Sequence, residues 1–342
     1  MKQESGGTEQ CTANGRAARK PGCAAASCAA CAAAEGDGAG HFPGAVPPCA
    51  AAPHPEQSGP ERFDREQRRA AFSSPLPAVK YKLFVMSGKG GVGKSSVAVN
   101  VAAALALAGR KVGIVDADLH GPSVAGLLGS RACAVGADEA SGKLLPAEFM
   151  PNLHFISMAG VLRDRDRAVI WRGPKKSAAV LRFIKDVAWG ELDFLIVDSP
   201  PGTGDEHLTV LKALPDILAV IVTTPQELSL ADVRRALGFL KTAGGKILGL
   251  AENMSGLSCP HCGGDIRLFK KGGGRLLAEE YGIPFLGEIP LDPAAVLSAD
   301  LGLPLAAADG DGAAARAFAA LAAEVDARCR AGAAVDFAAR AE

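Results

Sequence analysis

The chain lacks several features that would place it among membrane, secreted or nucleic-acid-coating proteins. No apolar run reaches the roughly 18 residues that a membrane-spanning helix needs. The first residues, MKQESGGTEQ, lack the basic-then-apolar layout of an export signal. Lysine and arginine number 37, as do aspartate and glutamate, so the formal net charge is zero and no basic nucleic-acid footprint is expected. We therefore expect a cytoplasmic protein without a membrane or nucleic-acid partner.

Residues 1–75 have almost no aromatic or β-branched side chains and are rich in alanine, glycine and proline. Such a stretch cannot bury enough apolar surface to offset its ordering entropy, so we predict a mostly disordered tail with a short helix at Asp64–Ala71. Five of the nine cysteines lie in the first fifty residues. Cys28-x-x-Cys31 either forms part of a metal site with the upstream Cys11 and Cys23 or is incidental low-complexity sequence. The isolated Cys49, Cys133 and Cys329 are interpreted as structural or incidental.

From residue 76 to residue 330, strand-like and helix-like runs alternate, and residues 331–342 are expected to be a flexible tail. Runs such as FLIV and ILAVIV are typical of strands buried on both faces of a parallel sheet. We predict a three-layer α/β/α sandwich with a mostly parallel central sheet and with ligands at the carboxyl ends of the strands. The predicted strands are Lys82–Ser87, Lys111–Asp116, Leu153–Met158, Phe194–Asp198, Ile217–Thr223, Lys246–Glu252 and Phe285–Ile289. The predicted helices are Lys94–Ala108, Lys175–Val187, Asp205–Ala213, Ser229–Ala243, Gly274–Tyr281 and Ala313–Arg330.

The first strand-to-helix connection carries a phosphate-loop motif. Its sequence, SGKGGVGKSS, fits the pattern G-x-x-x-x-G-K-[ST]. Glycines let backbone N–H groups converge on phosphate oxygens, and the helix N-terminus adds a favourable dipole. Lys94 is expected to reach the β- and γ-phosphates of ATP, and the Ser95 hydroxyl to coordinate Mg²⁺. The candidate nucleotide-binding residues of this loop are Gly88, Lys89, Gly90, Gly91, Val92, Gly93, Lys94, Ser95 and Ser96.

Lys89 is a second lysine in the same loop, directly after the first glycine. Since Lys94 already serves the phosphates, a second ammonium adds repulsion unless it has a separate task. We hypothesise that Lys89 crosses to the phosphates of a partner subunit and stabilises charge in the transition state, as an arginine finger does. This role requires a homodimer.

Acidic side chains follow the second and fourth predicted strands. Asp198 ends an apolar strand, as a Walker B aspartate does, and is expected to hold Mg²⁺ through a water molecule. Asp118 is the candidate for positioning the attacking water. Asp116 and Asp205 either take part in this chemistry or cap loops and helices.

Two further features near the strand ends bear on the nucleotide. Gly202 and Gly204, in PPGTG, predict a mobile loop beside the γ-phosphate. Asn253 follows the sixth predicted strand, where its amide either reads the adenine edge or forms a turn.

Cys259-x-x-Cys262 lies between a predicted strand and the next helix. Two thiolates on one turn hold only one edge of a metal site, because zinc and iron–sulfur clusters need about four protein ligands. His261, between the two cysteines, is a poor third ligand. Either the tail or a second subunit must therefore complete the site, and a symmetric dimer would form a Cys₄ site on its two-fold axis.

Five segments, in this order, resemble the Mrp/ApbC-type iron–sulfur cluster carrier ATPases and their eukaryotic cytosolic scaffold relatives: SGKGGVGKSS, DADLHGPS, WRGPKKS, DSPPGTGDEH and ENMSGLSCPHCG. The resemblance covers residues 79 to 305 and implies a P-loop NTPase of the SIMIBI class. It implies a homodimer that bridges a [4Fe–4S] cluster through Cys259 and Cys262 of each subunit. It also implies slow ATP hydrolysis linked to cluster transfer, with an assembly scaffold as donor and apo iron–sulfur proteins as recipients. Lys89 matches the deviant Walker A lysine of that family.

The tail departs from the family pattern. The scaffold relatives carry four N-terminal cysteines ending C-x-x-C-x-x-x-x-x-C, whereas no cysteine follows six residues after Cys31 here. The small basic helical domain of many bacterial carriers is also absent. Two alternatives stay open: a partition or positioning ATPase of the ParA/MinD type, and a dimer whose Cys₄ site holds a purely structural zinc ion.

Overall fold

The computed structural model describes residues 79–129, 135–160, 173–259, 261–266, 268–308 and 312–336. The predicted tail at 1–75 lies outside the described residues, together with its helix at Asp64–Ala71 and its cysteines, and so does Cys133. Among the described residues, no helix has both the length and the apolar character needed to cross a membrane.

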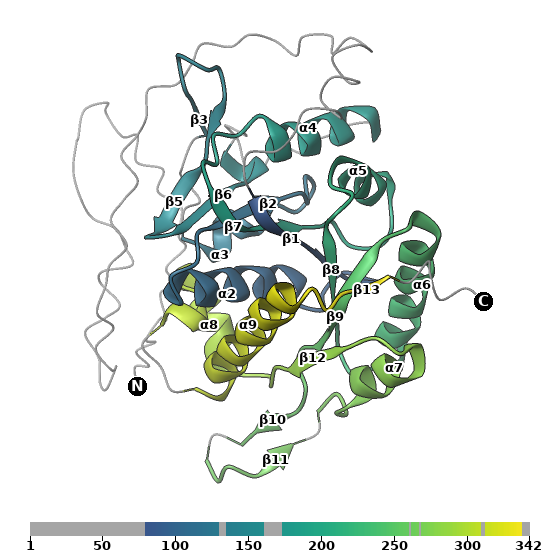
Figure 1. The fold of residues 1–342 in the computed structure, drawn as a ribbon. Coiled ribbons are helices and arrows are strands. Elements are labelled where there is room, and N and C mark those ends of the chain that lie inside the picture. The colour runs from purple at the N-terminus through teal and green to yellow at the C-terminus, as the bar shows by residue number, and fades with distance from the viewer. Residues whose placement is uncertain are drawn as a thin grey trace, which may run out of the picture. The chain divides into compact units, whose positions relative to one another are not determined.

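A mostly parallel β-sheet forms the centre of the described domain (Figure 1). Its strands are β1 (Val79–Met86), β2 (Val112–Asp116), β5 (Ala147–Met150), β6 (Leu153–Ile156), β7 (Leu192–Asp198), β8 (Leu218–Thr223), β9 (Lys246–Glu252), β12 (Phe285–Glu288) and β13 (Val335–Asp336). They follow the order β12-β9-β8-β1-β7-β2-β6-β5. Along this path only β5 is antiparallel to its neighbour β6, and β13 pairs antiparallel with the beginning of β9.

Helices cover both faces of the sheet (Figure 1). One face carries α2 (Lys94–Leu107), α3 (Val124–Leu127), α8 (Pro293–Leu301) and α9 (Ala313–Ala331), together with the 3₁₀ turn Leu305–Ala307. The other face carries α4 (Gly173–Lys185), α5 (Asp205–Ala213), α6 (Glu227–Ala243) and α7 (Gly273–Tyr281). The three layers agree with the predicted α/β/α sandwich.

Each central strand contributes to two hydrophobic cores because successive side chains point to opposite faces. In β1, Leu83 and Val85 pack with α2 and α9, whereas Phe84 and Met86 pack with the layer formed by α4, α5, α6 and α7. All four side chains are at most 3% exposed. This burial explains why the strands are apolar without alternation. It also holds their carboxyl ends, where the predicted site residues lie, in fixed positions.

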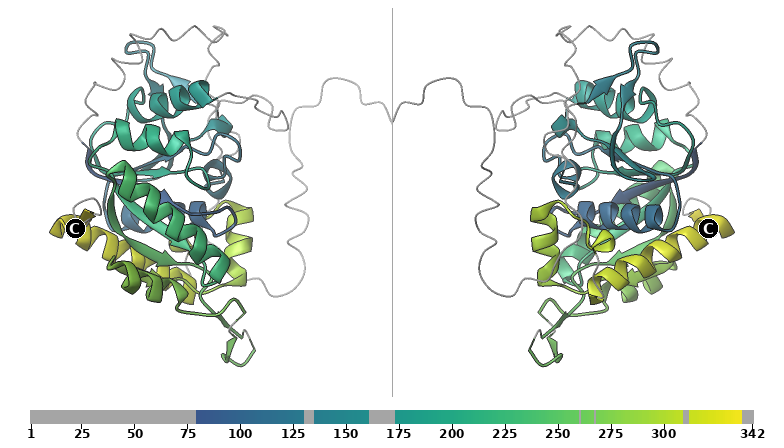
Figure 2. Two further views of the ribbon diagram at one scale, coloured as in Figure 1. Left: turned by 90° about the vertical axis from the view of Figure 1, so that its right-hand side faces the viewer. Right: turned by 90° about the vertical axis from the view of Figure 1, so that its left-hand side faces the viewer.

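Small elements extend the sheet domain. The hairpin of β10 (Leu257–Ser258) and β11 (Asp265–Ile266) projects away from the sheet (Figures 1 and 2). A second hairpin pairs β3 (Gly136–Ala137) with β4 (Leu144–Leu145), and Met158–Gly160 forms a 3₁₀ turn.

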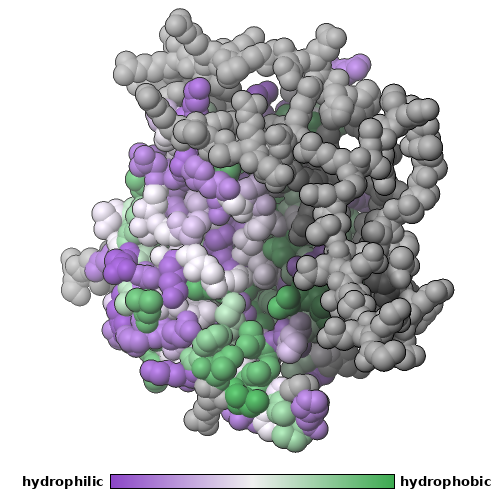
Figure 3. Space-filling view, turned by 180° about the vertical axis from the view of Figure 1, so that it is seen from behind, coloured by the Kyte–Doolittle hydropathy of each residue, from purple (hydrophilic) through white to green (hydrophobic). Residues whose placement is uncertain are grey.

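α8 buries none of its nine residues, although it is largely apolar. Val296, Leu297 and Leu301 are between 63% and 69% exposed. The helix lies on the side of the molecule seen from behind, where hydrophobic surface gathers towards the lower end (Figure 3).

The predicted elements match the structure closely at the sheet and less well at its periphery. β9 and α5 have the predicted bounds, and most other predicted ends differ by one to three residues. The elements α3 and α8 and the short hairpins were not predicted from the sequence. Residues 331–342 were predicted to be a flexible tail, but α9 ends at Ala331 and β13 pairs with β9 through Val335 and Asp336. Residues 337–342 lie outside the described part of the chain.

Candidate functional site

The phosphate loop connects β1 to α2 and contains two glycines in the left-handed region. Gly91 has φ +80° and Gly93, which caps α2, has φ +79°. A Cβ atom at Gly88 would lie 2.3 Å from the backbone of Asp232 in α6, so this position is confined by packing. The loop residues predicted to bind phosphate therefore form a compact turn at the N-terminus of a helix, where backbone N–H groups and the helix dipole favour an anion.

Lys94 and Asp198 form a buried ion pair at the carboxyl edge of the sheet. The Lys94 ammonium lies 2.5 Å from Oδ1 of Asp198, and the two side chains are 7% and 0% exposed. The other carboxylate oxygen, Oδ2, is buried and has no hydrogen-bond partner among the described residues. A buried acceptor of this kind fits a hydrated Mg²⁺, which takes oxygen ligands and keeps several waters. The adjoining Ser95 hydroxyl, 3.3 Å from the Lys94 ammonium, supplies a second oxygen at the same place.

Asp116 lies beside Asp198 because β2 and β7 are neighbours in register at these two residues. It is fully buried and accepts hydrogen bonds from the Ser157 hydroxyl at 2.8 Å and from the backbone N–H groups of Val124 and Asp118, both at 3.2 Å. Burial, together with the neighbouring Asp198 carboxylate, raises the pKa of Asp116 to about 8. Burial also raises the pKa of Asp198, and the Lys94 ammonium opposes this rise. Asp116 thus holds the loop that follows β2 and the first residue of α3, which are the contacts of the capping alternative, and a part in the chemistry stays a prediction.

Asp118 occupies that loop and is partly exposed. Its Oδ1 accepts hydrogen bonds from the backbone N–H groups of His120 and Gly121 at 3.2 and 3.0 Å. The carboxylate therefore shapes the loop, while its electrostatic influence extends to Asp198. Asp205 is the first residue of α5 and is exposed, and its backbone carbonyl accepts a hydrogen bond from Thr209.

The PPGTG loop is attached to the phosphate loop at one end and to α5 at the other. The N–H of Gly202 donates to the carbonyl of Ser87 at 3.2 Å. The N–H of Gly204 donates to Nδ1 of His207 at 3.1 Å. His207 is fully buried, and burial lowers the pKa of His207 to about 4, so the ring is neutral near pH 7 with its Nδ1 available as an acceptor. This arrangement holds the loop beside the site.

The side chains of Lys89 and Asn253 differ in their burial and in their hydrogen-bond partners. Lys89 is partly exposed, and its ammonium forms no ion pair or hydrogen bond with any described residue. The Asn253 amide is buried and donates to the carbonyl of Val92 at 2.9 Å. In this structure, the contact of Asn253 is with the phosphate loop itself, and its reading of adenine stays a prediction.

The cysteine hairpin, defined as residues 256–271, carries both cysteines of the C-x-x-C motif on its turn. The N–H of Cys259 donates to the carbonyl of Gly264 at 2.8 Å, and the N–H of Gly263 donates back to Cys259 at 2.9 Å. Hydrogen bonds from the backbone N–H groups of His261 and Cys262 lower the pKa of the Cys259 thiol. Because Cys262 is exposed and Cys259 partly exposed, the turn offers two sulfurs to an external ligand.

The cysteine site is incomplete within the described residues. No group of three His, Cys, Asp or Glu side chains there is arranged to hold a metal ion. The candidates Cys28 and Cys31 lie outside the described residues, as do Cys11, Cys23, Cys49 and Cys133. Cys329 is buried in α9, where burial raises the pKa of its thiol to about 12, in agreement with a structural role.

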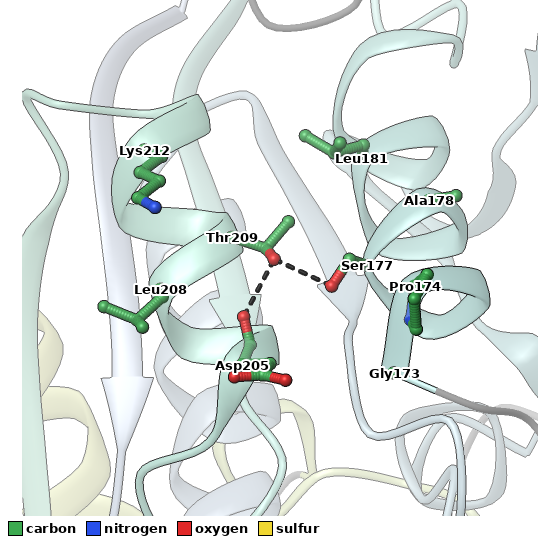
Figure 4. Close-up of a pocket in the computed structure, with 9 residues that line it drawn as sticks. All are labelled: Gly173, Pro174, Ser177, Ala178, Leu181, Asp205, Leu208, Thr209 and Lys212. Atoms are coloured by element: carbon green, nitrogen blue, oxygen red, sulfur yellow. Dashed lines mark hydrogen bonds between the residues drawn. The ribbon is translucent and has the colours of Figure 1, made fainter. Parts of the chain in front are cut away.

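A separate pocket of about 340 Å³ lies between α4 and α5 (Figure 4). The Thr209 hydroxyl lies between Oγ of Ser177 at 2.9 Å and the carbonyl of Asp205 at 2.8 Å, which links the two helices along one wall. Apart from Asp205, no residue predicted to take part in the chemistry lines this pocket.

Sequence reasoning missed Glu252, Ser157 and His207. Glu252 is fully buried at the end of β9 and accepts hydrogen bonds from Ser255 and from the backbone at the beginning of α7. Its signal was present, since Glu252 ends an apolar strand as Asp198 does. The roles of Ser157 and His207 depend on contacts between segments distant in sequence, which no local pattern gives.

Comparisons with known proteins place the chain in a family. The family model of the NUBPL iron-transfer P-loop NTPase matches residues 78–326. The iron-sulfur cluster carrier protein of Methanocaldococcus jannaschii is 45% identical over 244 residues, which cover 71% of this chain and 83% of that protein. The human cytosolic Fe-S cluster assembly factor NUBP2 is 46% identical over 228 residues, covering 66% of this chain and 84% of that protein.

Solved structures show the same fold. A nucleotide-binding protein from Archaeoglobus fulgidus in complex with ADP is 39% identical, with a TM-score of 0.58, and the match covers 66% of this chain and 87% of that chain. The cell division ATPase MinD of Pyrococcus furiosus is 26% identical, with a TM-score of 0.54, covering 73% of this chain and 99% of that chain. These matches confirm the predicted P-loop fold and the resemblance inferred from the five motifs. The chain belongs to the NUBPL family of iron-transfer P-loop NTPases.

Proposed function

We propose that this protein is an ATP-dependent iron–sulfur cluster carrier. Two copies bind one [4Fe–4S] cluster through Cys259 and Cys262 of each copy, hydrolyse ATP slowly, and pass the cluster to apo iron–sulfur proteins. The observation that carries the proposal is the pairing of a buried phosphate-loop site with an exposed, incomplete two-cysteine turn in one domain. The names of the relatives, a cluster carrier and a cytosolic assembly factor, support it.

Residues around Lys94 perform the nucleotide chemistry in this proposal. Lys94, now paired with Oδ1 of Asp198, turns to the β- and γ-phosphates when ATP enters, and its departure leaves both carboxylate oxygens of Asp198 available to a ligand. Ser95 and Asp198 hold Mg²⁺, which neutralises charge that develops on the phosphate oxygens. Asp118 orients the attacking water from the loop that Asp116 organises. Lys89, which has no partner among the described residues, reaches the phosphates of the other subunit.

The hairpin supports binding of the cluster as cargo. Thiolates are the ligands that iron–sulfur clusters require, and the backbone N–H groups at Cys259 favour the thiolate form. A site with two ligands from each chain, on an exposed turn, gives up its cluster when the two copies separate. We propose that an assembly scaffold supplies the cluster and that the exchange takes place in the cytoplasm, as the naming of the human relative suggests.

Anaerobic reconstitution with iron and sulfide tests the proposal. Iron, sulfide and zinc are counted per dimer, whose mass is measured by light scattering. We expect about four irons and four sulfides per wild-type dimer. Cys259→Ser/Cys262→Ser should lose them and keep ATP binding, and the matched control Ser258→Ala, an exposed change in the same hairpin, should behave as wild type.

The other outcomes separate the alternatives. Zinc alone in the wild type would indicate a structural metal site, and the absence of any metal would contradict the carrier proposal. A full cluster in the double cysteine variant would place the cluster on the N-terminal cysteines, among which Cys28 and Cys31 are the candidates.

A further inference from the structure

Two adjacent residues at the end of β9 connect the phosphate loop with the cysteine hairpin. The side chain of Asn253 contacts the phosphate loop, and the side chain of Glu252 contacts both ends of the segment that carries Cys259 and Cys262. Neither connection was predicted from the sequence, and the proposed function does not require either of them.

The Asn253 contact is buried and tight. Its Nδ2 donates to the carbonyl of Val92 at 2.9 Å, and a Cβ atom at Gly93 would lie 2.2 Å from the same nitrogen. The backbone N–H of Asn253 donates to the carbonyl of Thr223 at 2.7 Å, which fixes the residue to the end of β8. Because the peptide unit is planar, holding the Val92 carbonyl also sets the direction of the Gly93 N–H, one of the groups of the phosphate loop.

The Glu252 carboxylate holds the two ends of the hairpin together. Oε1 accepts from the Ser255 hydroxyl at 2.6 Å and from the N–H of Gly272 at 2.8 Å, and Oε2 accepts from the N–H of Gly274 at 2.5 Å. Ser255 and Gly272 directly flank the hairpin, and Gly274 lies in the first turn of α7. The carboxylate is fully buried, and two of the three groups that donate to it are backbone N–H groups at the beginning of α7.

The first end of the hairpin is also attached to the segment that leads from β12 to α8. The N–H of Ser255 donates to the carbonyl of Ile289 at 2.9 Å, and the N–H of Leu291 donates to the carbonyl of Gly256 at 2.8 Å. The hairpin thus begins on rigid, hydrogen-bonded backbone, whereas its turn with the two cysteines is exposed. A displacement at Asn253 therefore reaches the base of the hairpin through three consecutive peptide bonds.

We propose that Asn253, Glu252 and Ser255 form a coupling element through which the nucleotide controls the cysteine pair. When the phosphate loop closes on ATP, the Val92–Gly93 peptide and the Asn253 amide change together, and the Glu252 clamp transfers the change to both ends of the hairpin. The three residues are positioning residues, because none of them touches the cluster. The inference rests on the proposed function for its purpose, but the coupling itself can be measured without a cluster.

Alkylation of the apo protein tests the coupling. The full-length chain is treated with iodoacetamide with and without Mg²⁺–ATP, and the rates at Cys259 and Cys262 are read separately by peptide mass spectrometry. Allosteric couplings of the usual size predict at least about a fivefold difference between the two conditions in the wild type. Lys94→Ala should remove the difference at an ATP concentration that saturates the wild type, because it greatly weakens ATP binding.

Two variants outside the nucleotide site decide the question. In Glu252→Gln, an amide NH₂ faces backbone donors, and in Ser255→Ala one bond of the clamp is lost. Both should bind ATP in a fluorescent-nucleotide titration, yet the ratio of alkylation rates should fall towards one. Ser258→Ala, the exposed serine on β10, is the matched control and should keep the wild-type ratio.

The coupling fails if the wild type shows no ATP-dependent difference, or if both clamp variants keep the wild-type ratio. A loss of ATP affinity in Ser255→Ala as large as that in Lys94→Ala would also overturn it, because these residues would then belong to the nucleotide site. Iron content after reconstitution is measured in parallel. A chain without a cluster but with the alkylation difference contradicts the carrier proposal alone, and a cluster without the difference contradicts the coupling alone.

Discussion

The phosphate-loop site and the cysteine hairpin are built in opposite ways, although they belong to one domain. The nucleotide site lies at the edge of a parallel sheet, where Asp116, Asp198 and Lys94 are buried and Lys94 forms an ion pair with Asp198. The hairpin consists of two-residue strands around an exposed turn, with Cys262 open to solvent. A change of conformation in a buried site requires many packed side chains to move, whereas an exposed turn changes its conformation at a small cost in free energy. This contrast fits the proposed function, in which a rigid nucleotide site is combined with an exposed turn that binds a cluster and releases it.

The contrast also explains why the connection between the regions lies at the base of the hairpin. A rigid turn would hold a cluster too firmly to release it, and a fully mobile one could not receive a signal from the nucleotide. The Glu252 carboxylate fixes the ends of the hairpin and leaves its turn free.

Removing each lysine of the phosphate loop should give the largest effect. Lys94→Ala removes a buried cation from the phosphates and from Asp198, so ATP affinity and the rate of hydrolysis should both fall by about 10²- to 10³-fold. Lys89→Ala should keep ATP affinity but lose about 10³-fold in rate, because in the proposed function Lys89 serves the partner's phosphates and not those of its own subunit. Nucleotide titration and phosphate release measure the two effects.

Reconstituted iron content should stay at the wild-type level in both lysine variants, since the hairpin does not depend on either side chain. Lys241→Ala, an exposed lysine at the end of α6, is the control and should change neither property. A Lys89→Ala protein with the full rate and normal dimerisation would remove the proposed role of Lys89.

A glycine-to-alanine substitution should lower the free energy of unfolding more in the phosphate loop than in the cysteine hairpin. We expect this effect to be smaller than that of the lysine substitutions. Gly93→Ala puts a Cβ into a left-handed position and against the buried Asn253 amide, so the free energy of unfolding should fall by about 3 kcal/mol. Gly263 also has positive φ, but nothing lies within 4 Å of its Cβ position. Gly263→Ala should therefore lower the free energy of unfolding by about 1 kcal/mol or less. Urea unfolding measures both.

The functional consequences should be separated in the same way. Gly93→Ala should weaken ATP binding, whereas Gly263→Ala should leave ATP binding intact and reduce the iron bound after reconstitution, because it changes the backbone directly after Cys262. Equal loss of stability in the two variants would show that the hairpin is as integral to the fold as the phosphate loop. Gly142→Ala, at another open position with positive φ, controls for the backbone cost alone.

Much of the nucleotide region followed from the sequence because its signals are local. The glycine pattern, the lysine after it and the aspartate closing an apolar strand each lie within a few residues, and the structure brings Lys94 and Asp198 together as expected. The sheet was predictable for the same reason, since strands buried on both faces are apolar without interruption.

The rest depends on contacts between distant segments. No side chain of α8 is buried, so its apolar residues show no helical periodicity in the sequence. The short strand β13 forms through its pairing with β9, a contact between distant segments. The Asn253 amide faces Val92 across a separation of 161 residues. A sequence pattern can give the residue type at such a position but not its partner, and this is why neither the contact of Asn253 with the phosphate loop nor the role of Glu252 was predicted.

The smallest of the three expected effects is the dependence of the free energy of unfolding on pH, which comes from buried titratable groups at the nucleotide site. Because the folded pKa of Asp116 lies near 8, the folded chain keeps a proton that the unfolded chain has lost between about pH 4 and about 8. The free energy of unfolding therefore falls as pH rises through this window. His207 acts in the opposite direction: its pKa is lowered from 6.5 to about 4, so its contribution to stability is lost as pH falls below 6.5.

Between about pH 6.5 and 8, Asp116 contributes to the pH dependence and His207 does not. The free energy of unfolding should fall there by on the order of 1 kcal/mol per pH unit. Urea unfolding at several pH values should show this fall in the wild type and a much flatter profile in Asp116→Asn. His207→Asn keeps an acceptor for the Gly204 N–H, and the fall should then extend below pH 6.5 because the opposing group is gone. Asp300→Asn, an exposed carboxylate on α8, should follow the wild type throughout. If Asp116→Asn kept the wild-type slope, the titration would not belong to Asp116, and that carboxylate would be more open to solvent than its packing implies.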